Sequence, residues 1–425
     1  MKLKHLSTAM ILATLPATGV FAAALDRSGQ SISAFLQPGN YFEAGLSVLD
    51  ADVSGTTKAN YPNAALPLLS NTSVGEMADS YQFAHAALKL QLADQLSFGL
   101  IYDQPFGAKA TYSTDTAKLP AVLPGAAAAL QGQGAFHNGT EGTSVEVETQ
   151  NISMLFGVQP IKNVNLYAGG VYQTVKGGVQ LRGAAYGGIN AFGGYNADIP
   201  EDSAAGWLAG AAYQIPEIAL KASVTYRSEI KHKVNIDESS AGVGPIAAIL
   251  NNATGSTDIT TPQSVNLDLQ TGIMANTVAF ANVRWVNWKD FAIRPYAFGV
   301  AANAATAAVG GKGFDLVAYT DDQWSVNAGV GRKLNEQWAG NVSVGWDSGA
   351  GNPITTLGPT EGYWNLGVGV QFSPAANYFI SGGVKYFWLG DAKAQSGAQF
   401  NTDNYVADFT SNNAIAYGMK IGYKF

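Results

Sequence analysis

The segment IAYGMKIGYKF, residues 415–425, gives the strongest indication of fold in this chain. Large apolar and aromatic side chains alternate in it with small or charged ones, and the apolar series runs to Phe425. A period of two residues predicts a β-strand with one apolar face and one small or polar face. Similar alternation recurs at residues 96–102, 265–273, 324–330, 338–346 and 364–372. The chain is therefore expected to be all-β, built from many amphipathic strands.

The first residues have the parts of an export signal. Lys2 and Lys4 precede a mostly apolar segment at residues 9–17, and residues 20–24 offer small side chains for cleavage. This order is typical of a secretory signal peptide, and the apolar segment is too short to span a bilayer as a helix. We expect residues 1–22 to be removed and the rest of the chain to lie outside the cytoplasm.

Composition narrows the class of protein further. The chain has 425 residues, a formal charge of −7, no cysteine and only 13% charged residues. An acidic chain is a poor ligand for nucleic-acid phosphates, and a chain without cysteine forms neither disulfides nor thiolate metal sites. The 49 glycines and 19 tyrosines favour pleated sheet over disorder. We expect no nucleic-acid partner, no cofactor and no membrane-spanning helix.

Two kinds of connection join the alternating segments. Six are tight turns, at residues 92–95, 159–163, 214–218, 275–277, 334–337 and 373–377. Seven are longer, at residues 54–79, 106–144, 178–203, 237–260, 290–314, 347–362 and 390–404. Together they join fourteen strands over residues 41–425, with short turns on one side and long loops on the other. That arrangement predicts an antiparallel transmembrane β-barrel of the bacterial outer membrane, whose apolar face points toward lipid.

A soluble β-sandwich or propeller would also have alternating strands. The unequal connections and the aromatic residues at strand ends, such as Trp338, favour the membrane barrel. A barrel of fourteen strands is too wide to be filled by its own side chains. Residues 23–40 precede the first strand and predict a hatch folded into the lumen, with a flexible tail as the alternative. The apolar residues of this segment are Leu25, Ile32, Phe35 and Leu36.

Three groups of residues, taken in order, resemble one known family. They are 25–30 (LDRSGQ), 226–234 (YRSEIKHKV), and Asp347-Ser348 with Pro353 and 359–364 (PTEGYW). With these segments as the sharpest local matches, the chain resembles the bacterial outer-membrane long-chain fatty-acid transporters of the FadL/TodX type. The resemblance spans essentially the whole mature chain. The resemblance implies a fourteen-stranded barrel with an N-terminal hatch that includes Arg27. The family's Asn-Pro-Ala hatch motif is absent, and residues 37–40 (QPGN) stand in a similar place.

The resemblance also implies a function and a location. Hydrophobic substrates would enter from outside, bind in the lumen and leave sideways through an interruption of the third strand. Long-chain fatty acids or similar lipophiles are the expected ligands. We expect a monomer in the outer membrane of a Gram-negative bacterium, in contact with outer-membrane lipid and lipopolysaccharide. Transport of aromatic hydrocarbons or other lipophiles, a general porin, and an adhesin or receptor that uses only its loops are the alternatives.

Candidate ligand contacts follow from the chemistry of a fatty acid. Its carboxylate needs a cation or hydrogen-bond donors when it leaves water. By resemblance, Arg182 lies near the position of the family's carboxylate-binding arginine. Lys312 and Arg284 are further candidates, although each of the three could be a solvated surface charge. Pro105 and Gly107 could interrupt the third strand and open the wall sideways, or could simply end that strand.

The loops and histidines bear on the remaining possibilities. Apolar segments at residues 119–124, 243–250 and 296–300 could form loop helices that collect a ligand, or could pack over the barrel mouth. The histidines outside the signal have neither zinc-site spacing nor a nucleophile motif beside them. They are His85, His137 and His232. We therefore do not expect an enzyme.

Overall fold

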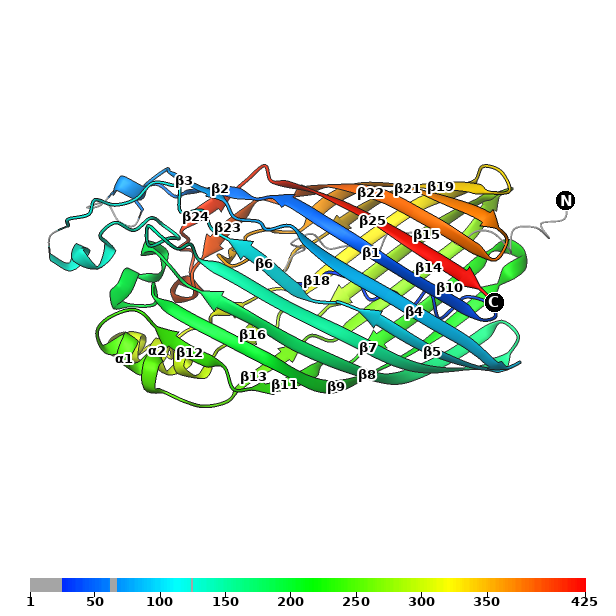
Figure 1. Ribbon diagram of the computed structural model, residues 1–425, viewed down its shortest axis with the longest axis horizontal. Helices are drawn as coiled ribbons and strands as arrows, with labels where there is room; N and C mark the ends of the chain where they lie inside the picture. The colour runs from blue at the N-terminus through cyan, green and yellow to red at the C-terminus, as the bar shows by residue number, and fades with distance from the viewer. Residues whose placement is uncertain (1–24, 62–66, 124) are drawn as a thin grey trace.

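The computed structural model describes residues 25–61, 67–123 and 125–425, so the predicted signal peptide, residues 1–22, lies outside the described residues. Within the described residues, fourteen antiparallel strands form a closed barrel wall, which confirms the predicted fold (Figure 1). The wall strands are β1 (Tyr41–Asp52), β4 (Tyr81–Ala93), β5 (Leu96–Asp103), β7 (Ser144–Ile161), β8 (Val164–Gln180), β9 (Tyr195–Ile215), β10 (Leu220–Arg227), β14 (Ser264–Met274), β15 (Thr277–Val286), β18 (Gln323–Lys333), β19 (Trp338–Asp347), β21 (Tyr363–Ala375), β22 (Tyr378–Leu389) and β25 (Asn413–Lys424).

The first and last wall strands form the seam that closes the barrel. β1 pairs with β25 in antiparallel register from Tyr41 opposite Lys424 to Asp52 opposite Asn413. On its other edge β25 pairs with β22. A sheet whose first and last strands pair has no free edge, which is the condition for crossing a bilayer with strands. The segment at residues 415–425 therefore belongs to the strand that completes the wall.

The two faces of the wall are reversed relative to a soluble protein. On β21 the outward residues Trp364, Leu366 and Val368 are 58%, 48% and 53% exposed. The inward residues Asn365 and Gln371 on the same strand are buried in the lumen. Because apolar side chains are outside and polar ones inside, this confirms the predicted orientation toward lipid.

Aromatic residues mark the two edges of the apolar band. On the loop side, Trp346, Trp364 and Trp388 lie in register on three neighbouring strands. On the turn side, the rings of Trp338 and Phe372 lie 4.7 Å apart. Such rings are typical of the two membrane interfaces, so the bilayer core lies between them.

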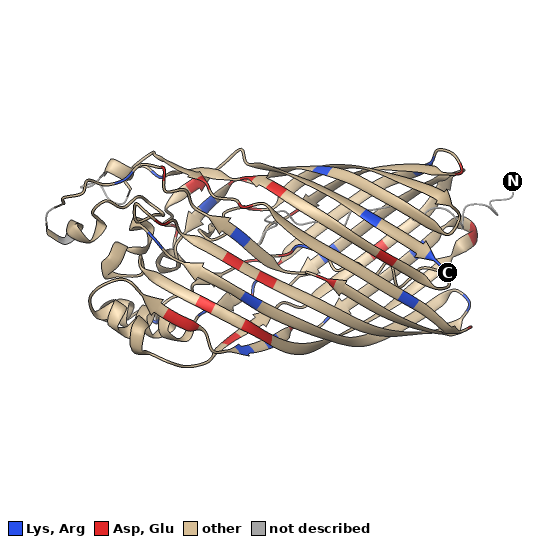
Figure 2. Ribbon diagram, viewed as in Figure 1, with Lys and Arg blue, Asp and Glu red and all other residues tan. Residues whose placement is uncertain are grey.

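Beyond the loop-side aromatic residues, the outer surface of the wall becomes charged. Lys109 pairs with Glu146 at 3.6 Å, and Lys176 pairs with Glu148 at 3.1 Å. Figure 2 shows acidic and basic residues side by side on these long strands. Charges of both signs suit a surface in contact with water or lipid headgroups, because burying them in hydrocarbon would be costly. The wall therefore continues out of the membrane on this side.

The predicted turns lie at one end of the barrel and the long loops at the other (Figure 1). Several predicted loop boundaries are wrong. The third long loop covers only residues 181–194, because β8 and β9 stay paired as far as Gln180 opposite Asn196. The fourth begins at residue 228, directly after β10, and the fifth and seventh extend to residues 322 and 412. The loops contain short strands that also alternate, so the sequence pattern does not show where a wall strand ends and a loop begins.

The loops fold into a cap with its own apolar core. Two predicted apolar segments form the helices α1 (Pro245–Asn252) and α2 (Tyr296–Thr306), which bury Leu250 and Phe298. Among the described residues, no helix is long and apolar enough to cross a membrane. The other loop strands are β2 (Ser54–Thr57), β3 (Ser73–Glu76), β11 (Ile230–Val234), β12 (Asp237–Ser240), β13 (Thr257–Thr261), β16 (Ala292–Ile293), β17 (Val317–Ala318), β20 (Ile354–Thr355), β23 (Ala392–Gln395) and β24 (Ala407–Phe409).

The third strand of the wall is interrupted. β5 ends at Asp103 opposite Asn151, and its continuation β6 (Gly107–Thr111) begins opposite Glu148. The third strand thus carries one residue more than β7 across this interval, which makes a bulge. On the other edge, the ladder between β4 and β5 stops at the Ala86–Tyr102 pair. The predicted interruption lies in this region, with Pro105 inside it and Gly107 at its end.

Candidate functional site

Residues 25–40, which we call the hatch, lie inside the barrel. Ile32, Phe35 and Leu36 are buried in one cluster with apolar residues of β7 to β9. A Cβ atom at Gly99 or Gly157 would collide with the ring of Phe35, so these glycines form a notch that admits the ring. The predicted apolar anchors of the hatch therefore contact the inner wall, and Figure 1 shows the segment before β1 within the outline of the barrel.

A buried ion pair holds the beginning of the hatch. Arg284 on β15 donates from Nε to Asp26 Oδ2 at 2.7 Å and from Nη2 to Asp26 Oδ1 at 3.1 Å. The guanidinium also donates to Asn266 Oδ1 at 2.7 Å and to Gln30 Oε1 at 3.0 Å. Two parallel bonds between a guanidinium and a carboxylate fix both distance and orientation. Arg284 therefore positions the hatch across the lumen.

The hatch also docks on the interruption of the third strand. The Arg27 backbone N–H donates to Pro105 O at 2.7 Å, and the Gly107 N–H donates to Leu25 O at 2.9 Å. The Arg27 guanidinium lies 3.4 Å from the centre of the Tyr81 ring and donates from Nε to Gly107 O at 2.5 Å. Backbone groups at the interruption are thus paired by the hatch.

Glycine is required at the end of this interruption. A Cβ atom on Gly107 would lie 2.7 Å from Val147 O and 2.9 Å from Arg27 Nε. Beside it, Ser28 Oγ donates to Asp103 Oδ2 at 2.7 Å. The hatch residues 25–28 therefore follow the interruption closely from inside the barrel.

On the loop side of the hatch lies a small apolar cavity of about 30 Å³, which we call the outer pocket. It is bounded by the strands β6 to β9, by two loops and by hatch residue Leu25. Among the described residues that line it, none has a charged side chain, and the polar side chains are those of Tyr319 and Thr355. The apolar lining includes Val145, Val147, Val179, Ile199, Ile293, Leu316 and Leu357.

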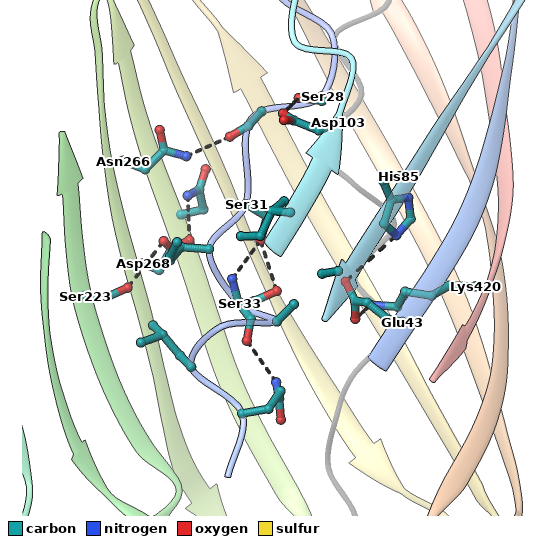
Figure 3. Close-up of a pocket in the computed structure, with 18 of the residues that line it drawn as sticks. Ser28, Ser31, Ser33, Glu43, His85, Asp103, Ser223, Asn266, Asp268 and Lys420 are labelled. Atoms are coloured by element: carbon teal, nitrogen blue, oxygen red, sulfur yellow. Dashed lines mark hydrogen bonds and ion pairs between the residues drawn. The ribbon is translucent and has the colours of Figure 1, made fainter. Parts of the chain in front are cut away.

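On the turn side lies a larger cavity of about 200 Å³, which we call the lower cavity (Figure 3). The hatch runs along it between Ser28 and Gln37, and two polar groups face each other across it. One group is Glu43, which pairs with Lys420 at 3.2 Å. The other is Asp268, which accepts a hydrogen bond from Asn282 Nδ2 at 2.7 Å. Apolar side chains such as Ile32, Ile101 and Phe280 also line the cavity, so it offers both apolar and polar surface.

The three predicted carboxylate contacts lie in different surroundings. Arg182 anchors a loop, because its guanidinium donates to Glu141 Oε2 at 2.8 Å and to Tyr195 O at 3.0 Å. Lys312 is exposed in the fifth long loop. Arg284 faces the lumen, but its donors already bind the hatch. The three cations therefore share no common site, and their ligand roles stay predictions.

The contact residues that sequence reasoning missed lie mostly beside the predicted ones. Asp26 stands next to Arg27, and its pairing with Arg284 joins positions 258 residues apart. Phe106 follows Pro105, and its ring packs edge-on against buried Trp288 at 5.4 Å. The motif at residues 25–30 marked Asp26 as part of the hatch, but no local pattern identifies a partner so distant in the chain.

A transmembrane barrel with an internal hatch and an apolar pocket above it defines a plugged outer-membrane channel for hydrophobic molecules. The chain belongs to the family described as outer membrane protein transport protein (OMPP1/FadL/TodX), whose model matches residues 31–425. Members of this family are transport channels of the outer membrane, and the chain shares that location and the transport of hydrophobic molecules.

Solved structures agree with this fold. A FadL homologue of Pseudomonas aeruginosa is 15% identical, with a TM-score of 0.67 and 92% of each chain covered. The toluene transporter TodX of Pseudomonas putida is 12% identical, with a TM-score of 0.58, 96% of this chain and 97% of that chain covered. The toluene transporter TbuX of Ralstonia pickettii is 12% identical, with a TM-score of 0.57 and the same coverage. None of the curated protein sequences compared with the chain matches it.

Proposed function

We propose that the chain takes up long-chain fatty acids by facilitated diffusion, binding them in the lumen and releasing them sideways into the outer membrane. The observation that carries this proposal is the outer pocket, whose described lining residues are mostly apolar, include no charged side chain and end at hatch residue Leu25. An apolar site beneath the loops gains free energy from covering hydrocarbon surface. The pocket is small, so an acyl chain enters it only as its walls move apart, and Leu25 is part of those walls. Ligand binding and hatch position are therefore coupled.

The interruption of the third strand supports sideways release. Its backbone is paired by hatch residues Leu25 and Arg27 rather than by β4. A shift of residues 25–27 would leave these wall groups unpaired and the gap beside Pro105 open toward lipid. The outer pocket includes Gly107, so the pocket and the interruption share a residue. Release into the bilayer suits a ligand with low solubility in water.

Transport of a neutral aromatic hydrocarbon is the second candidate function. The specific observation in its favour is that the part of the chain the structure describes places no cation in the lining of the outer pocket. The acyl chain of a fatty acid gains from this apolar lining but its carboxylate does not, whereas toluene needs no polar partner. The names of TodX and TbuX describe toluene transporters, which is the same ligand class.

Uptake by whole cells separates the two ligands. Cells that lack the gene and cells that carry it on a plasmid are given radiolabelled oleate or radiolabelled toluene. We expect the plasmid to restore oleate uptake and to change toluene uptake little. Restoration of toluene uptake alone would replace the fatty-acid proposal with the hydrocarbon one.

Liposome swelling tests the general porin. We expect liposomes that contain the purified chain to swell no faster in small sugars than empty liposomes, because the hatch lies across the lumen. Rapid swelling would show an open aqueous channel and would overturn the plugged-channel proposal.

A further inference from the structure

A buried tryptophan just after β15 lies against the interruption of the third strand. Trp288 is 0% exposed, and its ring packs edge-on against Phe106 with 5.4 Å between the ring centres. Its indole Nε1 donates to Gln323 Oε1 at 2.7 Å, and Gln323 Nε2 donates in turn to Asp347 Oδ2 at 2.6 Å. The apolar and the polar part of the indole are thus both held, as is usual for a buried tryptophan. Trp288 therefore fixes the position of the Phe106 ring.

Phe106 is the residue at which the hatch meets the wall. Its backbone forms an isolated antiparallel bridge with Asp26 of the hatch. Its N–H donates to Thr149 Oγ1 of β7 at 2.9 Å, and its C=O accepts a hydrogen bond from the Thr149 N–H at 3.1 Å. The Phe106 ring is 4% exposed and belongs to the apolar core of the cap. A shift of this ring would therefore act on the hatch contact and on the wall contact together.

The chain segment that carries Trp288 also holds the hatch. Arg284 lies four residues before Trp288 and binds Asp26 through two parallel hydrogen bonds. Asp26 is the bridge partner of Phe106, so residues 284–288 contact both members of that bridge. The hatch, the third strand and the fifth long loop thus meet at one junction. A movement of residues 284–288 would change the hatch and the interruption at once.

Two further rings connect this junction to the outer pocket. Tyr319 lines the pocket, and its ring lies edge-on to Trp288 at 5.4 Å. The ring of Phe291 lies 5.0 Å from Trp288 and 5.8 Å from Tyr319. The pocket holds only about 30 Å³, so a hydrocarbon chain that enters it displaces its wall, of which Tyr319 is part. Because close-packed side chains transmit strain, a displacement of Tyr319 reaches Trp288.

We propose that Trp288 is a positioning residue for release, which transmits displacement of Tyr319 at the outer pocket to Phe106 at the interruption. Without ligand, the Trp288 ring holds Phe106 in its bonds with Asp26 and Thr149, and the interruption is closed. When a ligand pushes Tyr319 aside, Trp288 loses its support and Phe106 is free to leave the hatch. This inference rests on the proposed function and adds an order of events, in which filling of the outer pocket precedes opening of the wall.

Hydrogen exchange at the interruption tests this role. Exchange at residues 104–107 is followed by mass spectrometry in the full chain in lipid nanodiscs, with and without oleate, and radiolabelled oleate measures binding. In the unmodified chain we expect oleate to speed this exchange by about tenfold. In Trp288→Leu we expect exchange without ligand to be about tenfold faster than in the unmodified chain, and oleate to change it less than about twofold. The affinity for oleate should stay within about twofold, because Trp288 does not line the pocket.

Two further variants separate a positioning role from a general loosening of the cap. Phe298→Leu removes a buried ring of α2, which packs against Phe192 and Phe314. We expect this control to keep both the slow exchange without ligand and the response to oleate. Trp288→Phe keeps a ring beside Phe106 and loses only the hydrogen bond to Gln323, so it should restore the response to oleate.

Each outcome decides the proposal. Slow exchange in Trp288→Leu, or equal acceleration in Phe298→Leu, would overturn the role of Trp288 and leave the proposed function intact. Oleate that binds the unmodified chain without speeding exchange at residues 104–107 would also overturn it. Absence of oleate binding would count against the proposed function, and exchange without ligand would still decide whether Trp288 holds the interruption. If Trp288→Leu does not fold, Phe106→Leu removes the other ring of the contact, and slow exchange that responds to oleate in this variant overturns the proposal.

Discussion

Asp26 and Arg284 form the buried ion pair that attaches the beginning of the hatch to the wall. Both side chains are buried, with 7% and 2% of their surfaces exposed. Removing one partner from a buried pair leaves the other charge without compensation, which is more costly than replacing both. The pair therefore ties hatch position to one residue of β15.

Loss of the Asp26 charge should loosen the hatch. We expect Asp26→Asn to weaken its attachment by about 3–5 kcal/mol, because the charge of Arg284 then lacks its partner. Channel openings in planar lipid bilayers should become more frequent. Glu217→Gln is the control, because its pair with Lys162 spans 4.0 Å between exposed side chains. Equal opening frequencies in the three proteins would contradict the proposed attachment.

Glu361, in the sixth long loop, should make stability depend on pH. The pKa of Glu361 is raised from 4.5 to about 7, chiefly by burial. Repulsion from Asp347 and Asp321 contributes to the rise, and backbone hydrogen bonds from Gly351 and Ala350 oppose it. Between these pH values the unfolded chain releases the proton first, so the free energy of unfolding falls as pH rises. Below pH 4.5 Glu361 is protonated in both the folded and the unfolded chain, so it no longer makes the free energy of unfolding depend on pH.

Glu361→Gln removes this dependence. We expect its thermal unfolding midpoint to equal that of the unmodified chain at about pH 4 and to exceed it at about pH 8, as followed by circular dichroism. Glu336→Gln is the control, because Glu336 is 94% exposed. A difference that does not grow over this pH range would show that Glu361 does not titrate in this way.

Arg284 could be predicted only as one lumen possibility, because buried Val278 and Val286 share its face of β15 and obscure the alternation there. Its partner could not be predicted. Alternation is local, whereas Asp26 lies 258 residues away. Arg182 shows the same limit, because Glu141 is 41 residues away and belongs to another loop. Sequence spacing gives the face on which a side chain lies, and only the folded barrel gives its partner.

The hatch supplies hydrogen-bond partners to the interrupted third strand. Pro105 lacks a backbone N–H, so it cannot donate a ladder hydrogen bond. The extra residue makes a bulge between β5 and β6, and the ladder with β4 stops before this bulge. The hatch pairs with this backbone from the inside. We propose that the interruption becomes an opening only when the hatch moves away from it.

Removal of the extra residue should close this route. Deletion of Gln104 should let β5 continue into β6 in regular register, sealing the wall against lipid. We expect oleate binding to persist and oleate uptake by cells to fall strongly. Uptake at the level of the unmodified chain would exclude sideways release through this interruption.

The notch for Phe35 should control the mobility of the hatch. Gly99→Ala places a methyl group against the Phe35 ring, whereas a Cβ on Gly170 meets nothing within 4 Å. We expect Gly99→Ala to speed hydrogen exchange of hatch residues 31–37 and Gly170→Ala to leave it unchanged. Similar exchange in both variants would show that Phe35 does not depend on the notch.

The strands of the wall could be predicted because their signals are local. Short turns and period-two alternation fix most strand ends to within a few residues. The start of β9 was missed because pairing of β8 with β9 continues beyond the membrane, where no change in alternation marks the bilayer edge. Loop residues such as Trp288 are buried by segments distant in the chain, so their place in the apolar core could not be predicted from the local sequence.

The barrel as a whole depends on its lipid-facing band. We expect a charge in this band, introduced by Val368→Arg, to destabilise the folded barrel by about 2–4 kcal/mol in lipid vesicles, as measured by urea titration. Ser203→Arg, on the exposed part of β9 beyond the aromatic residues, should cost about 0–1 kcal/mol. Equal costs at the two positions would contradict the assigned membrane depth.

The seam between β1 and β25 has a consequence for biogenesis. The hatch directly precedes β1, so it is synthesised early, while the strand that completes the wall is synthesised last. The hatch must therefore already be enclosed, or must thread inward, when the final hydrogen bonds zip shut. Closure of the seam between β1 and β25 and entry of the hatch into the lumen are thus coupled steps of assembly.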